Sequence, residues 1–248
     1  MIDSLKQYLE KNNYNNFDLK AVVFDMDGVL YDSMPAHAKS WQETMEHFGF
    51  TTTKPEDFFM QEGRVGDATI DLIFENERKR LASEEEKREI YAYKSKLFSD
   101  YNSGDILPGS DKVIDMVKDN NLLPVLVTGS GQPTLLDNLN NHFPNTFTRE
   151  TMVTAFDVEI GKPHPEPFLM GLQKGGNLKP NQAIVIENAP LGTEAAHRAG
   201  VFTIAVNTGP LDDKILWDSG ANMVLRSMVE LNDILPKLLE AIKSVTQN

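Results

Sequence analysis

Short apolar runs alternate with segments of helical periodicity after Pro108-Gly109, and this alternation restricts the fold more than any other feature of the sequence. The runs have the length of strands, and glycine directly follows several of the helical segments. The predicted strands lie near 124–127, 183–186, 202–206 and 223–225, and the predicted helices near 110–120, 133–143, 165–174 and 190–199. Such an order is typical of an α/β fold, in which a Rossmann-like, mostly parallel sheet carries helices on both faces.

Residues 33–104 follow a different pattern, because their apolar residues keep helical spacing throughout. The expected apolar stripes are Trp41, Met45 and Phe48; Ile70, Ile73 and Phe74; and Ile90, Tyr93, Leu97, Phe98 and Tyr101. Ser83 and Glu86 form a capping box that begins the third helix. The apolar run at 21–24 precedes this region and has only the later sheet to join. We therefore predict a core domain of residues 1–32 and 105–248, interrupted by an all-helical cap domain of residues 33–104. Residues 1–18 are expected to form a short helix on a loose asparagine-rich tether.

Composition excludes several classes of protein. The 248 residues are 40% hydrophobic and include no cysteine, so a sizeable core is possible and disulfides are not. The longest apolar stretches fall far below the ~18 residues of a membrane span, and no signal layout is seen, so we expect a soluble, cytoplasmic protein without a membrane partner. A net charge of −13 argues against a nucleic acid partner. The same charge repels phosphate esters, so an anionic substrate would need local positive charge. No protein partner can be inferred.

The first candidate site is Asp25-Met26-Asp27-Gly28, directly after the run at 21–24. Residues two apart in extended backbone point to the same side, so the carboxylates of Asp25 and Asp27 can face one metal ion. Ligands of open parallel sheets bind beyond the carboxyl ends of the strands, where this pair is expected. Asp and Gly also favour ordinary turns, and this stretch alone does not decide between a site and a turn.

Further candidate residues lie in three later loops: Thr128, Gly129, Ser130 and Gly131; then Lys162; then Glu187 and Asn188. Hydroxyls and free N–H groups at a helix start bind anions such as phosphate, and carboxylate and amide oxygens are suitable Mg²⁺ ligands. Each loop also has an ordinary interpretation as a Gly-Ser loop, a solvated lysine or a turn. The order of all four loops is more specific than any one of them. A carboxylate that attacks phosphorus needs a metal, a cation and N–H donors to offset the repulsion between two anions, and these loops supply them.

Taken together, these motifs resemble the haloacid dehalogenase superfamily, in particular its β-phosphoglucomutase-like branch with a helical cap inserted after the first strand. The resemblance implies that Asp25 is the nucleophile and Asp27 the acid/base. It implies that Thr128, Gly129, Ser130 and Gly131 bind the phosphoryl oxygens and that Lys162 bridges phosphate and nucleophile. Glu187 and Asn188 would complete a Mg²⁺ site with Asp25 and Asp27. The implied activity is a Mg²⁺-dependent phosphohydrolase that acts through an aspartyl-phosphate on a small anionic phosphate substrate.

Two departures from the branch bear on the substrate. Asn188 stands where most relatives have aspartate, which removes a negative charge from the metal site. In the loop Gln61-Glu62-Gly63-Arg64-Val65-Gly66, Glu62 stands where β-phosphoglucomutases carry lysine, and their distal-phosphate arginine falls at about Gly66. A Glu-Gly-Arg cap loop and the stretch Glu-Asn-Ala-Pro-Leu-Gly are similar to those of bacterial inorganic pyrophosphatases of the superfamily. This resemblance implies that pyrophosphate is the substrate and that Glu62 reaches into the site, although most glutamates are simply exposed.

Three alternatives stay open. The chain could be a β-phosphoglucomutase, with Arg64 in place of the missing basic residue, or a sugar-phosphate phosphatase. As a non-enzyme it could be a phospho-acceptor switch that resembles response-regulator receivers. Receivers, however, lack a large helical insertion and an acid/base two residues after the acceptor. His37 has a counterpart in the mutases, but a lone histidine on a helix is more often structural, so we leave it out of the expected catalytic set.

Overall fold

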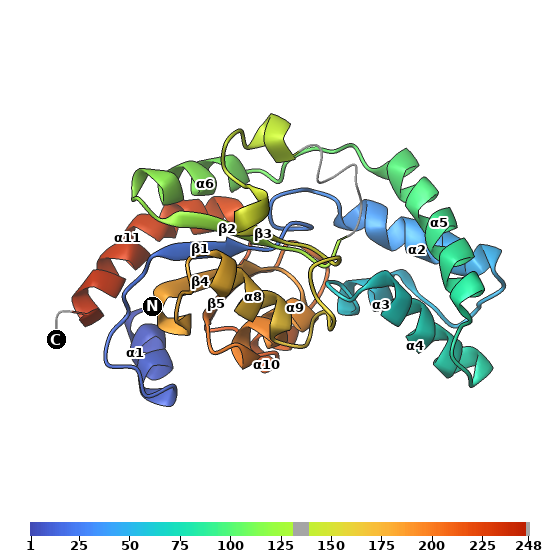
Figure 1. Ribbon diagram of the computed structural model, residues 1–248, viewed down its shortest axis with the longest axis horizontal. Coiled ribbons are helices and arrows are strands. Elements are labelled where there is room, and N and C mark those ends of the chain that lie inside the picture. The colour runs from blue at the N-terminus through green and yellow to red at the C-terminus, as the bar shows by residue number, and fades with distance from the viewer. Residues whose placement is uncertain (131–138, 247–248) are drawn as a thin grey trace.

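A six-stranded parallel sheet forms the centre of the computed structural model, which describes residues 1–130 and 139–246 (Figure 1). The strand order is β3-β2-β1-β4-β5-β6. The strands are β1 (Ala21–Phe24), β2 (Leu123–Val127), β3 (Met152–Val153), β4 (Ala183–Glu187), β5 (Phe202–Val206) and β6 (Met223–Leu225). The central strand β1 pairs with both β2 and β4, and Val23 lies between Val125 and Val185. The predicted α/β class is confirmed.

Helices cover both faces of this sheet (Figure 1). They are α1 (Ile2–Lys11), α6 (Ser110–Asp119), α8 (Glu166–Lys174), α9 (Pro190–Arg198), α10 (Asp213–Asp218) and α11 (Met228–Thr246), with short 3-10 turns at Arg149–Thr151 and Pro180–Gln182. Side chains alternate along β1, so Val22 and Phe24 pack with α6 and α11, whereas Val23 packs with α8 and α9. The predicted helix near 133–143 falls largely outside the described residues. Sequence periodicity missed β3, α10 and α11.

Four helices lie between β1 and α6 in the chain and build a hydrophobic cluster of their own. They are α2 (Met34–His47), α3 (Pro55–Met60), α4 (Gly66–Arg78) and α5 (Glu84–Tyr101), called here the α2–α5 segment. The expected N-cap of α5 is present, because Ser83 Oγ accepts a hydrogen bond from the Glu86 amide at 3.2 Å. Figure 1 places these helices together at one end of the sheet. The exact limits of the core and cap domains remain a prediction.

The buried face of α5 differs from the apolar stripe predicted for this helix. Ile90 and Phe98 are buried as expected, but the residue buried between them is Lys94. Tyr93 and Tyr101 are only partly buried. Because Ile90, Lys94 and Phe98 are spaced by four residues, they share one face of the helix, and a lysine occupies part of the inner face.

The amino-terminal helix packs against the sheet region, so the predicted loose tether is wrong. Leu5, Tyr8 and Leu9 are buried, and the Tyr8 ring contacts the Phe202 ring at a centroid distance of 5.4 Å. Tyr8 Oη also donates a hydrogen bond to the Gly200 carbonyl at 2.9 Å. The asparagine-rich stretch is also attached to the core, because Asn181 Nδ2 donates a hydrogen bond to the Asn16 carbonyl at 3.0 Å.

Within residues 1–130 and 139–246, no helix is both long enough and apolar enough to cross a membrane.

Candidate active site

The carboxyl ends of β1 and β4 bring two predicted carboxylates to one buried lysine. Lys162 Nζ donates to Asp25 Oδ1 at 2.5 Å, to Glu187 Oε1 at 2.6 Å and to the Val127 carbonyl at 3.2 Å. Burial raises the pKa of Asp25 to about 8, although the charge of Lys162 opposes this rise. Burial alone would lower the pKa of Lys162, but Asp25 and Glu187 raise it above its usual value. The lysine is therefore a fixed cation beside Asp25.

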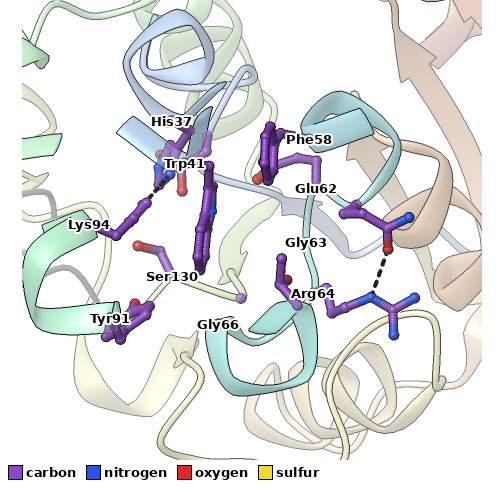
Figure 2. A pocket seen from close by; sticks show the side chains of 14 residues that line it. His37, Trp41, Phe58, Glu62, Gly63, Arg64, Gly66, Tyr91, Lys94 and Ser130 are labelled. Atoms are coloured by element: carbon purple, nitrogen blue, oxygen red, sulfur yellow. Dashed lines mark hydrogen bonds and ion pairs between the residues drawn. The ribbon is translucent and has the colours of Figure 1, made fainter. Parts of the chain in front are cut away.

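A second chain of contacts holds Asp27. Its Oδ1 accepts a hydrogen bond from Ser33 Oγ at 2.5 Å and lies 3.3 Å from His37 Nε2. Lys94 Nζ lies 2.8 Å from His37 Nδ1 (Figure 2). Since an ammonium group only donates, Nδ1 must accept, which leaves the imidazole proton on Nε2 facing Asp27. Burial opposes ionisation of Asp27, but His37, Ser33 and Lys94 together lower its pKa.

Lys94 and His37 are the residues that sequence reasoning missed. Burial lowers the pKa of Lys94 to about 8, with Asp27 and Glu62 opposing, and burial followed by the charge of Lys94 lowers the pKa of His37. The sequence held a signal for Lys94, because a lysine four residues from both Ile90 and Phe98 lies on the apolar face of its helix. No comparable spacing signal indicates that His37 lies beside Asp27.

The loop after β4 combines a fully bonded carboxylate with an unpaired amide oxygen. Glu187 Oε2 accepts hydrogen bonds from the amides of Asn188 and Ala189 at 2.8 and 2.9 Å. Among the described residues, no donor reaches the buried Asn188 Oδ1. The Asn188 side chain lies against Gly28, where a Cβ would come within 2.1 Å of Asn188 Nδ2. Gly28 has φ +77°, so glycine suits this turn in both conformation and space.

The loop after β2 carries the predicted hydroxyl residues. Thr128 and Ser130 are buried, and Thr128 Oγ1 accepts a hydrogen bond from the Ser130 amide at 2.9 Å. A Cβ on Gly129 would lie 2.5 Å from the Gly63 carbonyl oxygen, so the α2–α5 segment contacts this loop closely. Gly131 lies outside the described residues.

The α2–α5 segment and the carboxyl end of the sheet, called here the sheet edge, line a partly open cavity of about 40 Å³. Its lining includes Asp27, His37, Lys94, Ser130 and Glu62 (Figure 2). Burial, followed by the charges of Asp27, Asp25 and Glu187, raises the pKa of Glu62 well above its usual range, while Lys94 opposes this rise. Glu62 and Asp27 thus line the same cavity.

Arg64 takes a different direction from Glu62. Its side chain extends away from Lys94 and Ser130 in Figure 2, and its Nε donates to Gln61 Oε1 at 2.9 Å. Arg64 thus lines the same cavity as Asp27, with its guanidinium on the side away from Lys94 and Ser130.

The donor set around Asp25 fits Mg²⁺. Across residues 1–130 and 139–246, no three His, Asp or Glu side chains are grouped as a metal site by themselves, so other oxygen donors would have to contribute. The unpaired Asn188 Oδ1 and the nearby backbone of Asp27 offer such oxygens, and Mg²⁺ prefers carboxylate, amide and carbonyl donors.

Comparison with known proteins identifies relatives over most of the chain. Residues 22–206 match the family described as haloacid dehalogenase-like hydrolase. A solved structure from Bacteroides vulgatus, described as a candidate β-phosphoglucomutase, is 48% identical with a TM-score of 0.92, and the match covers 100% of this chain and 98% of that one. The phosphorylated carbohydrates phosphatase of Thermotoga maritima is 28% identical over 223 residues, covering 89% of this chain and all of the relative.

The β-phosphoglucomutase of Bacillus subtilis is 26% identical over 230 residues, covering 86% of this chain and 92% of that protein. These three relatives are named for carbohydrate phosphates and not for pyrophosphate. The expected resemblance to inorganic pyrophosphatases is therefore not supported. The alternative drawn from the sequence, a β-phosphoglucomutase or a sugar-phosphate phosphatase, fits these relatives better.

Proposed function

Because the chain belongs to the haloacid dehalogenase-like hydrolases, in their β-phosphoglucomutase-like group, we propose that it is a Mg²⁺-dependent phosphatase of small phosphorylated carbohydrates. The observation that carries this proposal is the buried bridge from Lys162 to Asp25 and Glu187, at 2.5 and 2.6 Å. It places a fixed cation beside a carboxylate at the carboxyl end of the sheet, which is the arrangement needed to bring two anions together.

In the proposed reaction an Asp25 oxygen attacks phosphorus, the bond from phosphorus to the leaving oxygen breaks, and Asp27 gives that oxygen a proton. Water then attacks the aspartyl-phosphate, Asp27 takes a proton from it, and the bond to Asp25 breaks to release phosphate. The low pKa of Asp27 suits the second step. For the first step Asp27 must be protonated, and the negative charge of a bound substrate raises its pKa in that direction.

Asp25, Asn188 and the Asp27 carbonyl would hold Mg²⁺, with Glu187 beside them. When bound, Mg²⁺ offsets the charge between nucleophile and phosphate. Thr128, Gly129, Ser130 and Lys162 would bind the phosphoryl oxygens. Gly131 belongs to the same expected set but lies outside the described residues.

Two observations favour a phosphatase over a mutase. The branch carries its distal-phosphate arginine at about Gly66, and here a Cβ at Gly66 would lie 2.2 Å from Tyr91 Cε2. A larger side chain therefore does not fit unless Tyr91 moves. The other candidate cation, Arg64, also lines the cavity, but its guanidinium lies away from Lys94 and Ser130 and its Nε is held by Gln61. To bind a second phosphate beside Asp27, this side chain would have to leave Gln61 and turn.

Pyrophosphate is a second candidate substrate because of Glu62. A carboxyl group whose pKa is raised by burial and neighbouring carboxylates can be protonated and donate a hydrogen bond to a phosphate oxygen. If pyrophosphate is a substrate, we expect Glu62→Ala to lower kcat/KM for it by about tenfold more than for monoesters, and Glu62→Gln, which keeps a donor, to restore much of the loss.

Initial rates of phosphate release test both candidates. The panel contains glycerol 3-phosphate, fructose 1-phosphate, β-glucose 1-phosphate and pyrophosphate, each with Mg²⁺ and with EDTA. We expect Mg²⁺-dependent release from carbohydrate phosphates and no conversion of β-glucose 1-phosphate to glucose 6-phosphate. Release from pyrophosphate alone would favour the second candidate, and isomerisation without release would identify a mutase.

A further inference from the structure

Aromatic rings form the helical side of the small cavity. Trp41 from α2, Phe58 from α3 and Tyr91 from α5 line it, together with Asp27 and Ser130 from the sheet edge. In Figure 2 the ring of Trp41 stands between Lys94 on one side and Phe58 on the other. The Trp41 and Phe58 rings are stacked with centroids 6.0 Å apart and an interplanar angle of 6°, and the Tyr91 ring lies 6.4 Å from Trp41.

Packing holds this aromatic wall, defined as Trp41, Phe58 and Tyr91, in place. Trp41 and Phe58 belong to the buried cluster of the α2–α5 segment, and Tyr91 packs against that cluster. Tyr91 also lies so close to Gly66 that a Cβ there would be 2.2 Å from its ring. Because interiors are close-packed, the wall cannot recede without disturbing these neighbours.

The cavity lies between the aromatic wall and the proposed acid. Its lining includes Asp27, the proposed acid for the leaving oxygen, and also Gly129 and Ser130 of the proposed phosphoryl loop, but none of Asp25, Thr128 and Lys162. A leaving group whose oxygen lies beside Asp27 would therefore meet the aromatic wall. Its volume is about 40 Å³. Since one water needs roughly 10–15 Å³ of such space, the cavity holds about three water-sized groups. Glycerol, with about six non-hydrogen atoms, exceeds this space about twofold, whereas a hexose, with about twelve, exceeds it about fourfold.

We propose that Trp41, Phe58 and Tyr91 act as a size filter, so that the enzyme hydrolyses phosphates of alcohols with three carbons or fewer in preference to hexose phosphates. This inference rests on the proposed phosphatase activity and narrows its substrate class. A hexose leaving group must displace the wall in order to place its oxygen beside Asp27, and the cost of that displacement lowers kcat/KM.

Steady-state kinetics with Mg²⁺ tests the filter on a series of increasing leaving-group size: acetyl phosphate, glycerol 3-phosphate, erythrose 4-phosphate and glucose 6-phosphate. For the wild type, we expect kcat/KM for glycerol 3-phosphate to exceed that for glucose 6-phosphate by about tenfold or more. Tyr91→Ala enlarges the cavity and should reduce this ratio by about tenfold, whereas Tyr91→Phe, which keeps the ring, should preserve it.

Tyr93→Ala is the matched control, because Tyr93 lies on the same helix but stacks on His47 at 4.2 Å and does not line the cavity. It should leave the ratio unchanged. A wild-type kcat/KM for glucose 6-phosphate that equals or exceeds the value for glycerol 3-phosphate overturns the filter but not the proposed phosphatase activity. This result does not depend on the folding of any variant. A folded Tyr91→Ala with the wild-type ratio also overturns it. No hydrolysis of any of the three phosphate esters in the series would overturn the proposed function and the filter together.

Discussion

The two sides of the site balance their charges in different ways. At the sheet edge, Lys162 is fully engaged by Asp25, Glu187 and a backbone carbonyl, and every partner is held by a strand end. On the helical side, Lys94 is buried against the neutral His37 and the rings of Trp41 and Phe98, and no carboxylate lies within ion-pair distance of it among the described residues. The difference suggests that the sheet edge performs the chemistry and that the helical side selects and orients the leaving group.

The largest expected effect is at the nucleophile. Asp25→Asn removes the attacking carboxylate and should lower kcat for the best substrate by about 10⁴-fold or more. Steady-state phosphate release measures this loss. Asp18→Asn, on an exposed carboxylate that pairs with Lys20, is the control and should keep wild-type activity. Substantial turnover by Asp25→Asn would show that the sheet edge does not act as described.

Removing the sheet-edge cation should affect both activity and stability. Lys162→Met leaves two buried carboxylates without their partner, so we expect about 10³-fold lower activity and a loss of roughly 3–5 kcal/mol in the free energy of unfolding. Urea denaturation measures the second quantity. Lys214→Met removes one partner of an exposed pair and should cost at most about 1 kcal/mol. Equal stability losses for the two variants would contradict the ion-pair account.

Removing the helical-side cation should affect activity alone. Lys94→Met fills the same space without burying a charge, so the free energy of unfolding should stay within about 1 kcal/mol of wild type or increase. Activity should fall by about 10- to 100-fold, because His37 loses the partner that orients it towards Asp27. Lys96→Met, an exposed position on the same helix, should change neither property. A stability loss as large as that of Lys162→Met would remove the contrast between the two sides.

The same contrast explains what could be predicted from the sequence. Asp25 and Glu187 lie at the carboxyl ends of β1 and β4, and the parallel pairing of these strands is sufficient to bring them together. Lys162 lies in the loop between β3 and α8, and its contacts with both carboxylates depend on the path of that loop. The aromatic wall comes from three different helices, and its geometry depends on how these helices pack, which periodicity does not encode. Lys94 was missed because lysines are ordinarily solvated, although its spacing from Ile90 placed it on the inner face. The strand β3 has only two residues, too few for a pattern.

Detection of a phosphorylated Asp25 tests the central claim most directly. Asp27→Asn blocks activation of water, and acetyl phosphate has a leaving group that needs no proton, so the first step should proceed and the second should stall. Rapid acid quench followed by peptide mass spectrometry should then find close to one phosphate per chain on Asp25, removable by hydroxylamine. The double variant Asp25→Asn/Asp27→Asn should take up none. Phosphate on another residue, or none on Asp27→Asn while the wild type hydrolyses acetyl phosphate, would contradict the account.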